Sequence, residues 1–379
     1  MSFINTTLHP SVSKAITEQG YSKATPIQQQ AIPATLERRD VLGCAQTGTG
    51  KTAAFLIPIL QMLLEDNYPQ RRPCIKALIL APTRELALQI AENTQSLSAH
   101  TTIKHVVLFG GVSQQPQIDK LRAGVDILIA TPGRLKDLMN QGHVALNQVK
   151  YLVLDEADRM LDMGFIHDIK QIIRHIPADR QTLFFSATMP TEILKLTHAL
   201  LRNPVRIEVT PVATAAEQVT QYVYFSEKQQ KPSLLLNLLG NQASETVIVF
   251  TKMKHVADKL SRFLNKEGIS AAAIHGNKSQ LQRQTALERF KHRQTRVLVA
   301  TDIAARGIDV DKLSHVINYD LPQTAETYVH RIGRTGRAGA AGTAISICSR
   351  EEKPMLIEIQ KLIKKTITVA SIPGYSQKN

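Results

Sequence analysis

The chain has 379 residues, 43% of them hydrophobic, which is enough to bury more than one core, so two domains are the natural expectation. It has no Trp, and its three cysteines show neither metal-ligand nor disulfide spacing, which favours reduced thiols. The first residues lack a secretory-signal pattern, and no apolar run approaches the roughly 18 residues that cross a bilayer. We therefore expect a cytoplasmic protein without a membrane segment.

The net charge of +14 favours a polyanionic partner. The charge is uneven: residues 1–208 hold 22 basic against 18 acidic side chains, and residues 209–379 hold 24 against 14. A well-solvated surface would explain the same excess. Charge therefore identifies a class of partner but no chemistry.

Short apolar runs alternate with amphipathic stretches through both halves of the chain. The runs lie at 41–42, 77–80, 106–109, 127–130, 151–154 and 182–185, and then at 246–250, 271–274, 296–300, 316–319 and 342–347. Such runs, separated by helical patterns, indicate strands of parallel sheets that are covered on both faces. The sequence therefore predicts an α/β protein with two tandem doubly wound parallel-sheet domains.

We expect a first domain at 1–208, a linker at 209–219, a second domain at 220–370 and a disordered tail at 371–379. The linker segment is small, polar and Pro-containing. Polar residues follow many of the predicted strands, and open parallel sheets bind ligands at the carboxyl ends of their strands. Each half should therefore present its chemistry at that edge, with the site between the halves.

A Gly-rich segment, AQTGTGKT at 45–52, lies between a predicted strand and an apolar helix. Such a turn aims backbone N–H groups and the helix dipole at a phosphate. Lys51 can reach the β- and γ-phosphates, and the Thr52 hydroxyl can ligate Mg²⁺. Ala45 stands where the usual pattern has its first Gly. A chance Gly-rich turn is the alternative, which the strand–loop–helix context disfavours. The predicted ATP-binding residues here are Ala45, Gln46, Thr47, Gly48, Thr49, Gly50, Lys51 and Thr52.

The predicted strand at 151–154 runs into Asp155, Glu156 and Asp158. Three carboxylates in four positions would be costly in a core without a cation. Asp155 can hold Mg²⁺ through its water shell, and Glu156 can polarise an attacking water. Asp155 as a simple helix cap is the alternative, which pairing with Lys51 and Thr52 disfavours.

Together with the P-loop, Asp-Glu-Ala-Asp at 155–158 resembles the DEAD-box RNA helicases, and the resemblance covers nearly the whole chain. It implies two RecA-like domains. Residues 20–28 resemble the family's Q motif, with Tyr21 stacking on adenine, Thr25 in the same motif and Gln28 bonding the adenine edge. An amide offers a donor and an acceptor together, which suits adenine and rejects guanine.

The segment HRIGRTGR at 330–337 places arginines among glycines. An exposed basic turn is the alternative from the residues alone. The resemblance implies that Arg334 and Arg337 act as arginine fingers on the γ-phosphate, that His330 connects the domains and that Asp309 contacts the ribose. It further implies a coupling role for Asp158, Ser186 and Thr188.

The resemblance also implies an RNA-contacting set, although common turns would explain several of its members. Hydroxyls, arginines and close-approach glycines suit phosphates and 2′-OH groups rather than base edges. We therefore expect sequence-independent RNA binding with a strong salt dependence. The predicted RNA-binding residues are Pro82, Thr83, Arg84, Gly110, Gly111, Thr131, Arg134, Thr251, His275, Gly276, Gln280, Arg283, Thr301 and Asp302.

The prediction is an ATP-dependent RNA helicase with ATP and Mg²⁺ as cofactors, acting as a monomer. It should hydrolyse ATP with RNA stimulation and separate short duplexes by gripping the RNA backbone between two domains. A P-loop motor on DNA would not need Gln28 to read adenine. A non-catalytic RNA scaffold would tolerate loss of Lys51, Glu156 or Arg334. Within the family, the compact length resembles bacterial RhlE-type helicases.

Overall fold

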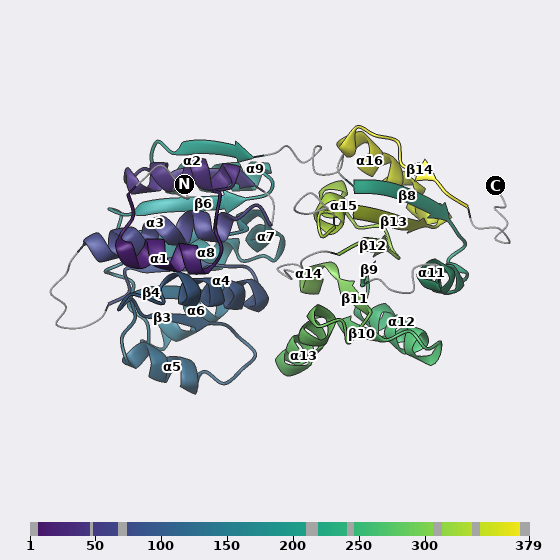
Figure 1. Cartoon of the computed structure of the whole chain (residues 1–379), viewed down its shortest axis with the longest axis horizontal. Helices are drawn as coiled ribbons and strands as arrows, with labels where there is room; N and C mark the ends of the chain where they lie inside the picture. The colour runs from purple at the N-terminus through teal and green to yellow at the C-terminus, as the bar shows by residue number, and fades with distance from the viewer. Residues whose placement is uncertain are drawn as a thin grey trace. The chain divides into compact units, whose positions relative to one another are not determined.

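The computed structural model describes residues 7–45, 48–66, 74–209, 219–240, 246–305, 313–335 and 342–371. The chain divides into two compact units, residues 1–209 and 210–379 (Figure 1). Within the described residues, each unit contains one seven-stranded parallel sheet. The prediction of two tandem parallel-sheet α/β domains is therefore confirmed. None of the helices in these ranges is long and apolar enough to cross a membrane.

The first unit opens with two helices and then alternates strands with helices. Its strands are β1 (Val41–Ala45), β2 (Ala77–Leu80), β3 (His105–Leu108), β4 (Ile127–Ala130), β5 (Tyr151–Leu154), β6 (Gln181–Ser186) and β7 (Val205–Val209). Its helices are α1 (Pro10–Glu18), α2 (Pro26–Leu36), α3 (Lys51–Glu65), α4 (Arg84–Leu97), α5 (Gln115–Arg122), α6 (Pro132–Asn140), α7 (Ala157–Asp162), α8 (Ile166–Ile173) and α9 (Thr191–Leu200). The strand order is β3-β4-β2-β5-β6-β1-β7.

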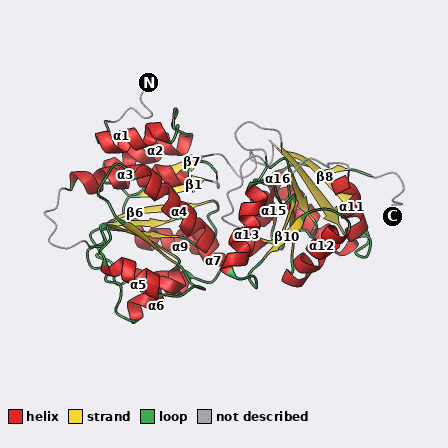
Figure 2. Ribbon diagram, turned by 60° about the horizontal axis from the view of Figure 1, so that its bottom comes forward, coloured by secondary structure: helices red, strands yellow, loops and turns green. Residues whose placement is uncertain are grey.

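Successive residues of each central strand in the first unit enter opposite cores. In β5, Tyr151 and Val153 pack with α2, α3 and α4, whereas Leu152 and Leu154 pack with the helices of the other face, α5 to α9. Figure 2 shows helices on both faces of the sheet. Because both faces are covered, these strands are continuous apolar runs, which is the signal that the sequence offers.

The second unit repeats this architecture. Its strands are β8 (Val219–Phe225), β9 (Val247–Thr251), β10 (Ala271–Ile274), β11 (Val297–Thr301), β12 (His315–Asn318), β13 (Gly342–Cys348) and β14 (Thr368–Val369). Its helices are α11 (Lys231–Gly240), α12 (Lys254–Lys266), α13 (Gln280–Lys291), α14 (Asp302–Ala305), α15 (Ala325–Ile332), η1 (Arg350–Glu352) and α16 (Lys353–Ile363). The order β10-β11-β9-β12-β13-β8-β14 equals that of the first sheet when strands are counted from the start of each unit.

The apolar-run pattern does not predict β7, β8 and β14. β7 alternates between exposed and buried positions, β8 does so over its first residues, and β14 is short and exposed. These strands lie at or next to a sheet edge, where one face needs no apolar cover. Val209 ends β7 and Val219 begins β8, so the two end residues of the expected linker belong to strands. Residues 210–218 of that linker and 372–379 of the expected tail lie outside the described residues.

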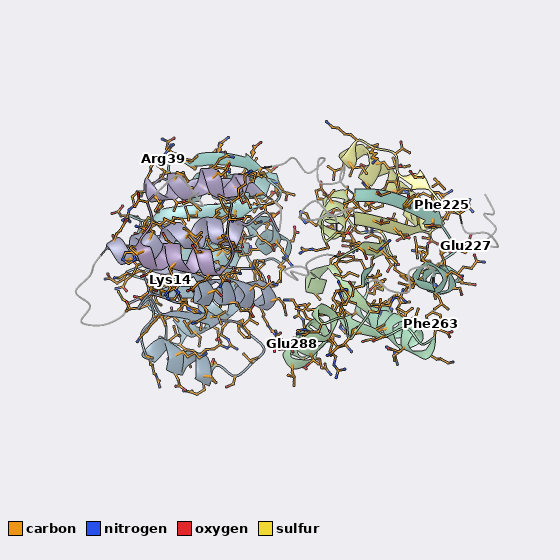
Figure 3. The ribbon with its side chains drawn as sticks, in the orientation of Figure 1. Lys14, Arg39, Phe225, Glu227, Phe263 and Glu288 are labelled. Atoms are coloured by element: carbon orange, nitrogen blue, oxygen red, sulfur yellow. The ribbon has the colours of Figure 1, made fainter. Side chains whose placement is uncertain are left out.

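A buried ion-pair cluster joins three strands of the second unit beyond their carboxyl ends. Lys231, 2% exposed, donates 2.7 Å to the Tyr319 carbonyl and 2.6 Å to Glu352 Oε2. Asp320 lies 3.6 Å from the same amine, and Glu352 also accepts bonds from the Ser349 and Leu321 amides. Figure 3 labels Phe225 and Glu227, where β8 ends and the chain turns towards α11.

Glu352 should make the stability of the second unit depend on pH. Burial alone would raise the pKa of Glu352, but the attraction of Lys231 and the hydrogen bonds it accepts hold that pKa below its ordinary value. A lowered folded-state pKa contributes stability above the unfolded-state pKa, and that stability is lost as pH falls through the folded-state pKa. Glu352→Gln should therefore cost about 3 kcal/mol at pH 7 and progressively less below about pH 4.

Urea unfolding followed by circular dichroism between pH 7 and pH 3 measures this difference. Glu358→Gln is the matched control, because Glu358 pairs with Lys361 on the exposed face of α16 and should cost at most about 0.5 kcal/mol. A Glu352→Gln penalty that stays constant down to pH 3 would contradict the interpretation.

Candidate active site and nucleic-acid interface

The strand order of the first sheet divides its carboxyl edge into two neighbouring groups. The P-loop follows β1, the carboxylates follow β5 and Ser186 ends β6, and these three strands are adjacent. The predicted RNA residues follow β2, β3 and β4, which are also adjacent. Residues between positions 45 and 188 of the sequence thus form a predicted nucleotide group and a predicted RNA group side by side.

The P-loop turn brings the Lys51 side chain back to the end of β1. Gly48 and Gly50 have φ of 86° and 91°, left-handed values that glycine adopts without a steric penalty. Lys51 begins α3, and its ammonium donates 2.9 Å to the Ala45 carbonyl and lies 3.9 Å from Asp155 Oδ1. The Lys51 side chain is therefore held in the turn from which α3 starts. Gln46 and Thr47 lie outside the described residues.

Each carboxylate after β5 has a different partner. Asp155 faces Lys51, and Glu156 forms an ion pair with Arg159 one helical turn along α7. Asp158 Oδ2 accepts bonds from the Thr188 amide at 2.9 Å and hydroxyl at 2.8 Å. Ser186 Oγ accepts from the Asp158 amide at 3.2 Å and donates to the Thr188 carbonyl at 2.7 Å. The structure thus brings together the predicted coupling residues of the first unit.

The Asp155 carboxyl has the chemistry of a cation ligand. Burial raises the pKa of Asp155 to about 6, although Lys51 acts against that rise. A carboxylate this deeply buried is stabilised by positive charge. Thr52, the second residue of α3, adds a hydroxyl next to Lys51. A carboxylate and a hydroxyl are hard oxygen ligands of the kind Mg²⁺ prefers, and Mg²⁺ commonly takes its remaining ligands from water and phosphate. These residues therefore fit a magnesium-bound nucleotide.

The Q-motif glutamine is bonded directly to the P-loop. Gln28 Oε1 accepts from the Thr25 amide at 2.8 Å, and Nε2 donates to the Gly50 carbonyl at 3.1 Å. A Cβ on Gly50 would lie 2.5 Å from that Nε2. A carboxamide has two further hydrogen-bonding positions beyond these, so Gln28 retains the capacity to read a base. Tyr21 is half-buried nearby in sequence, and burial raises its pKa.

Arg84 and Arg134 connect the three RNA segments of the first unit. A Cβ on Gly111 would lie 2.3 Å from Arg84 Nη1, so the guanidinium lies against the backbone of the Gly110-Gly111 turn. Arg134 Nη2 donates 3.0 Å to the carbonyl of Val112, the next residue. Two cations from different helices therefore converge on one exposed turn.

Several predicted RNA residues are buried and have structural partners. Thr83 Oγ1 caps α4 by accepting from the Leu86 amide, and Thr251 Oγ1 donates to the Met253 carbonyl. His275 is buried, with Nε2 3.0 Å from Asp258 Oδ2. The role of these side chains in RNA binding stays a prediction. Pro82, Thr131, Gln280 and Thr301 are buried as well. Among the predicted set, Gly110, Gly111, Gly276, Arg84, Arg134, Arg283 and Asp302 are exposed or partly exposed.

The arginine turn of the second unit lies at the amino end of its sheet. Thr335 forms a parallel bridge with Leu313, which precedes β12, and Thr335 Oγ1 donates 2.5 Å to the Leu313 carbonyl. Because α15 runs back across the sheet, the arginine turn lies apart from the polar residues that follow the strands of this unit. His330 and Arg334 are described, whereas Asp309 and Arg337 lie outside the described residues.

Arg331 is a functional candidate that the sequence motif did not single out. Its guanidinium makes a two-bond ion pair with Asp302 at 2.6 and 2.8 Å, and donates to Asn318 Oδ1 and the Asp320 carbonyl. The side chain is 2% exposed and lies 4.9 Å from the Phe250 ring centroid. Asp302, predicted to contact RNA, therefore has both carboxylate oxygens bound to Arg331. Helical spacing offers a signal, since Arg331 falls on the buried face of α15 with Tyr328 and Ile332.

Comparison with known proteins identifies the class. The family model of the DEAD/DEAH box helicases matches residues 25–196, and that of the helicase conserved C-terminal domain matches residues 230–339. ATP-dependent RNA helicase RhlB of Pseudomonas aeruginosa is 45% identical over 97% of this chain and 94% of its own. DEAD-box ATP-dependent RNA helicase RhpA of Helicobacter pylori is 42% identical over 99% of this chain and 75% of its own.

Solved structures agree with this class. Dbp5 of S. cerevisiae bound to RNA and ADP-BeF3 gives a TM-score of 0.85 at 31% identity, over 96% of this chain and 94% of that chain. Mss116p bound to ssRNA and AMP-PNP gives 0.87 at 30% identity, over 97% and 78%. The chain belongs to the DEAD-box family of ATP-dependent RNA helicases.

Arg331→Lys should destabilise the second unit despite keeping the charge. A lysine amine cannot reproduce the planar fork that binds Asp302, so the buried Asn318 and Asp320 acceptors lose donors. We expect a loss of about 3 kcal/mol in the free energy of unfolding, measured by urea denaturation. Lys259→Arg on α12 is a matched charge-conserving control and should change stability little. Equal stability of Arg331→Lys and wild type would contradict this role.

Proposed function

We propose that this chain binds MgATP at the β5, β6 and β1 end of its first sheet and hydrolyses it under the control of RNA bound beside it. The observation that supports this most is the division of the carboxyl edge into two adjacent groups. A nucleotide group and an RNA group on neighbouring strands of one rigid sheet can influence each other through short contacts.

In this proposal the residues of the first unit bind and orient the triphosphate. The P-loop amides and Lys51 hold the β- and γ-phosphates, and Gln28 reads the adenine edge. Thr52 and Asp155 hold Mg²⁺, which neutralises developing phosphate charge when bound. Glu156 accepts a proton from the attacking water. Adenine reading by Gln28 favours ATP over GTP.

In this proposal the second unit supplies two further cations, the arginine fingers, to the nucleotide. Arg334 and Arg337 would contact the γ-phosphate when the units close, while Asp309 would contact the ribose and His330 would meet the Thr188 segment. Arginine fingers contribute about 10³–10⁵ in rate, roughly 4–7 kcal/mol of transition-state stabilisation. A contribution of that size makes hydrolysis depend on closure.

RNA would be bound through its backbone. Arg84 and Arg134 converge on the Gly110-Gly111 turn in the first unit, and Gly276 and Arg283 are accessible in the second. Guanidinium groups and glycine amides suit phosphate oxygens rather than base edges. Binding should therefore be independent of sequence and sensitive to salt.

Closure on a gripped strand would separate a short duplex locally. Each base step costs on the order of 1.4 kcal/mol on the DNA stacking scale, so binding energy can separate a few steps and not many. Hydrolysis removes the γ-phosphate contact and reopens the units. A monomer in the cytoplasm and an RhlE-type specialisation stay predictions.

Two other functions are separated from this one by simple assays. A DNA motor would hydrolyse several nucleotides and respond to DNA, whereas this site should prefer ATP and RNA. A non-catalytic scaffold would bind RNA equally well with or without ATP turnover. Turnover of ATP and GTP with RNA or DNA distinguishes the three.

Glu156→Gln tests the catalytic assignment. The substitution keeps the shape of the side chain but removes its basicity, so RNA-stimulated kcat should fall by about 10²–10⁴-fold. ATP binding, measured with a fluorescent nucleotide, should be retained because Lys51 and Asp155 are intact. Wild-type turnover in Glu156→Gln would refute the proposal.

Gly111→Ala tests the RNA group. A Cβ there would collide with Arg84, and we expect RNA affinity to fall about tenfold and the salt slope to decrease by about one. Gly142→Ala is a matched control, since Gly142 has a similar φ of 76° but open space around its Cβ. Equal RNA affinity in the two variants, measured by fluorescence anisotropy, would contradict a role for Arg84 in RNA binding.

A further inference from the structure

Arg159 and Glu156 form a buried ion pair within the nucleotide group. Arg159 Nη1 bonds Glu156 Oε2, and both side chains are more than nine-tenths buried. Arg159 lies three residues after Glu156, which is the helical spacing that places two side chains on one face. Nothing in the P-loop or arginine-turn chemistry above requires Arg159.

The backbone at Glu156 is strained in a way that fixes this pair. Glu156 has φ 52° and ψ 53°, a left-handed conformation that is unfavourable for a residue with a Cβ. Its carbonyl accepts from the Arg159 amide at 3.0 Å and the Met160 amide at 3.2 Å, so α7 starts directly on it. Its amide donates 3.0 Å to Asp155 Oδ1. The backbone of Glu156 is therefore held on both sides, and the remaining freedom lies in the side chain.

An arginine suits the task of fixing that side chain. The guanidinium is planar and permanently charged, so it holds a carboxylate oxygen in a defined direction. A buried carboxylate without a partner is unfavourable, which keeps Glu156 on Arg159 rather than among alternative rotamers. Asp155 and Asp158 have partners of their own, Lys51 and Thr188, and do not compete for this guanidinium.

We propose that Arg159 is a positioning residue for Glu156 in ATP hydrolysis. It does not contact the nucleotide in this scheme; it sets the direction of the carboxylate that accepts the proton from water. This inference rests on the proposed function, in which Glu156 is the general base. It adds a residue whose loss should affect turnover and leave nucleotide binding intact.

Steady-state ATPase assays at saturating RNA provide the test. Arg159→Gln should lower kcat by about 10- to 100-fold, the usual effect of losing a group that orients a catalytic one, with KM for ATP and RNA affinity within about twofold of wild type. Arg159→Lys keeps the charge without the planar fork and should recover part of the loss. Arg180→Gln is the control: Arg180 lies at the amino end of β6, donates 2.9 Å to the Pro177 carbonyl, and should leave kcat unchanged.

A double-mutant cycle separates positioning from general structural damage. In the Glu156→Gln background, Arg159→Gln should cause no further loss of kcat, because the ion pair is already absent. The proposal would be overturned if the two substitutions lowered kcat by the product of their separate effects. Wild-type kcat in Arg159→Gln would overturn it as well. Should Arg159→Gln fail to fold, Arg159→Lys, which keeps the buried charge, takes its place as the single variant, and wild-type kcat in Arg159→Lys would overturn the proposal.

The same assays distinguish this inference from the proposed function. Wild-type turnover in Glu156→Gln would refute the general-base assignment and with it any positioning role. Lost turnover in Glu156→Gln together with normal turnover in Arg159→Gln would overturn only the role of Arg159.

Discussion

Three carboxylates buried at the end of one strand are the constraint on which the rest of the site depends. Asp155, Glu156 and Asp158 are 2%, 5% and 6% exposed, and unpaired burial of such groups would be prohibitive. Each is compensated from a different element: α3 provides a lysine, α7 an arginine, and the segment after β6 an amide and a hydroxyl. The compensating groups are thereby fixed in position. The contacts that compensate these buried charges therefore also fix the side chains that we propose to be catalytic.

The order of the strands places these carboxylates between two predicted sites. β5 lies between β2 and β6, so the carboxylates separate the RNA group on one side from the remainder of the nucleotide group on the other. In the second unit the corresponding strands β10, β11 and β9 precede the predicted RNA segments there. Arg331 bonds Asp302 at the end of β11 from a helix that leads to the arginine turn. Arg331 therefore joins the carboxyl end of β11 to the helix that leads into the arginine turn.

The sequence predicts strands that are buried on both faces, because these are continuous apolar runs. It does not predict which side chains from distant segments pair with each other. Central strands with two covered faces are continuous apolar runs, and all of those expected occur in the structure within a few residues. β7, β8 and β14 lack that signal, because β7 and the first part of β8 alternate between exposed and buried positions and β14 is short and exposed. Lys51 lies close to Asp155, and Thr188 bonds Asp158, as their positions after strands predict. The pairs of His275 with Asp258 and of Arg331 with Asp302 are tertiary, and no local pattern encodes those partners.

The two units show why a shared fold does not fix a shared function. β1 and β8 occupy the same place in their sheets, and each is followed by a helix that begins with a lysine, Lys51 or Lys231. In both units an acidic side chain that follows another strand of the same sheet lies close to that lysine: Asp155 to Lys51, and Glu352 to Lys231. Lys231 is neutralised by Glu352 at 2.6 Å, and its turn, 226–230, contains no glycine. Lys51 is 3.9 Å from Asp155, in a turn with two left-handed glycines. The short Lys231–Glu352 pair makes the lysine of the second unit structural. The longer Lys51–Asp155 distance beside a glycine turn suits the lysine of the first unit to bind phosphate.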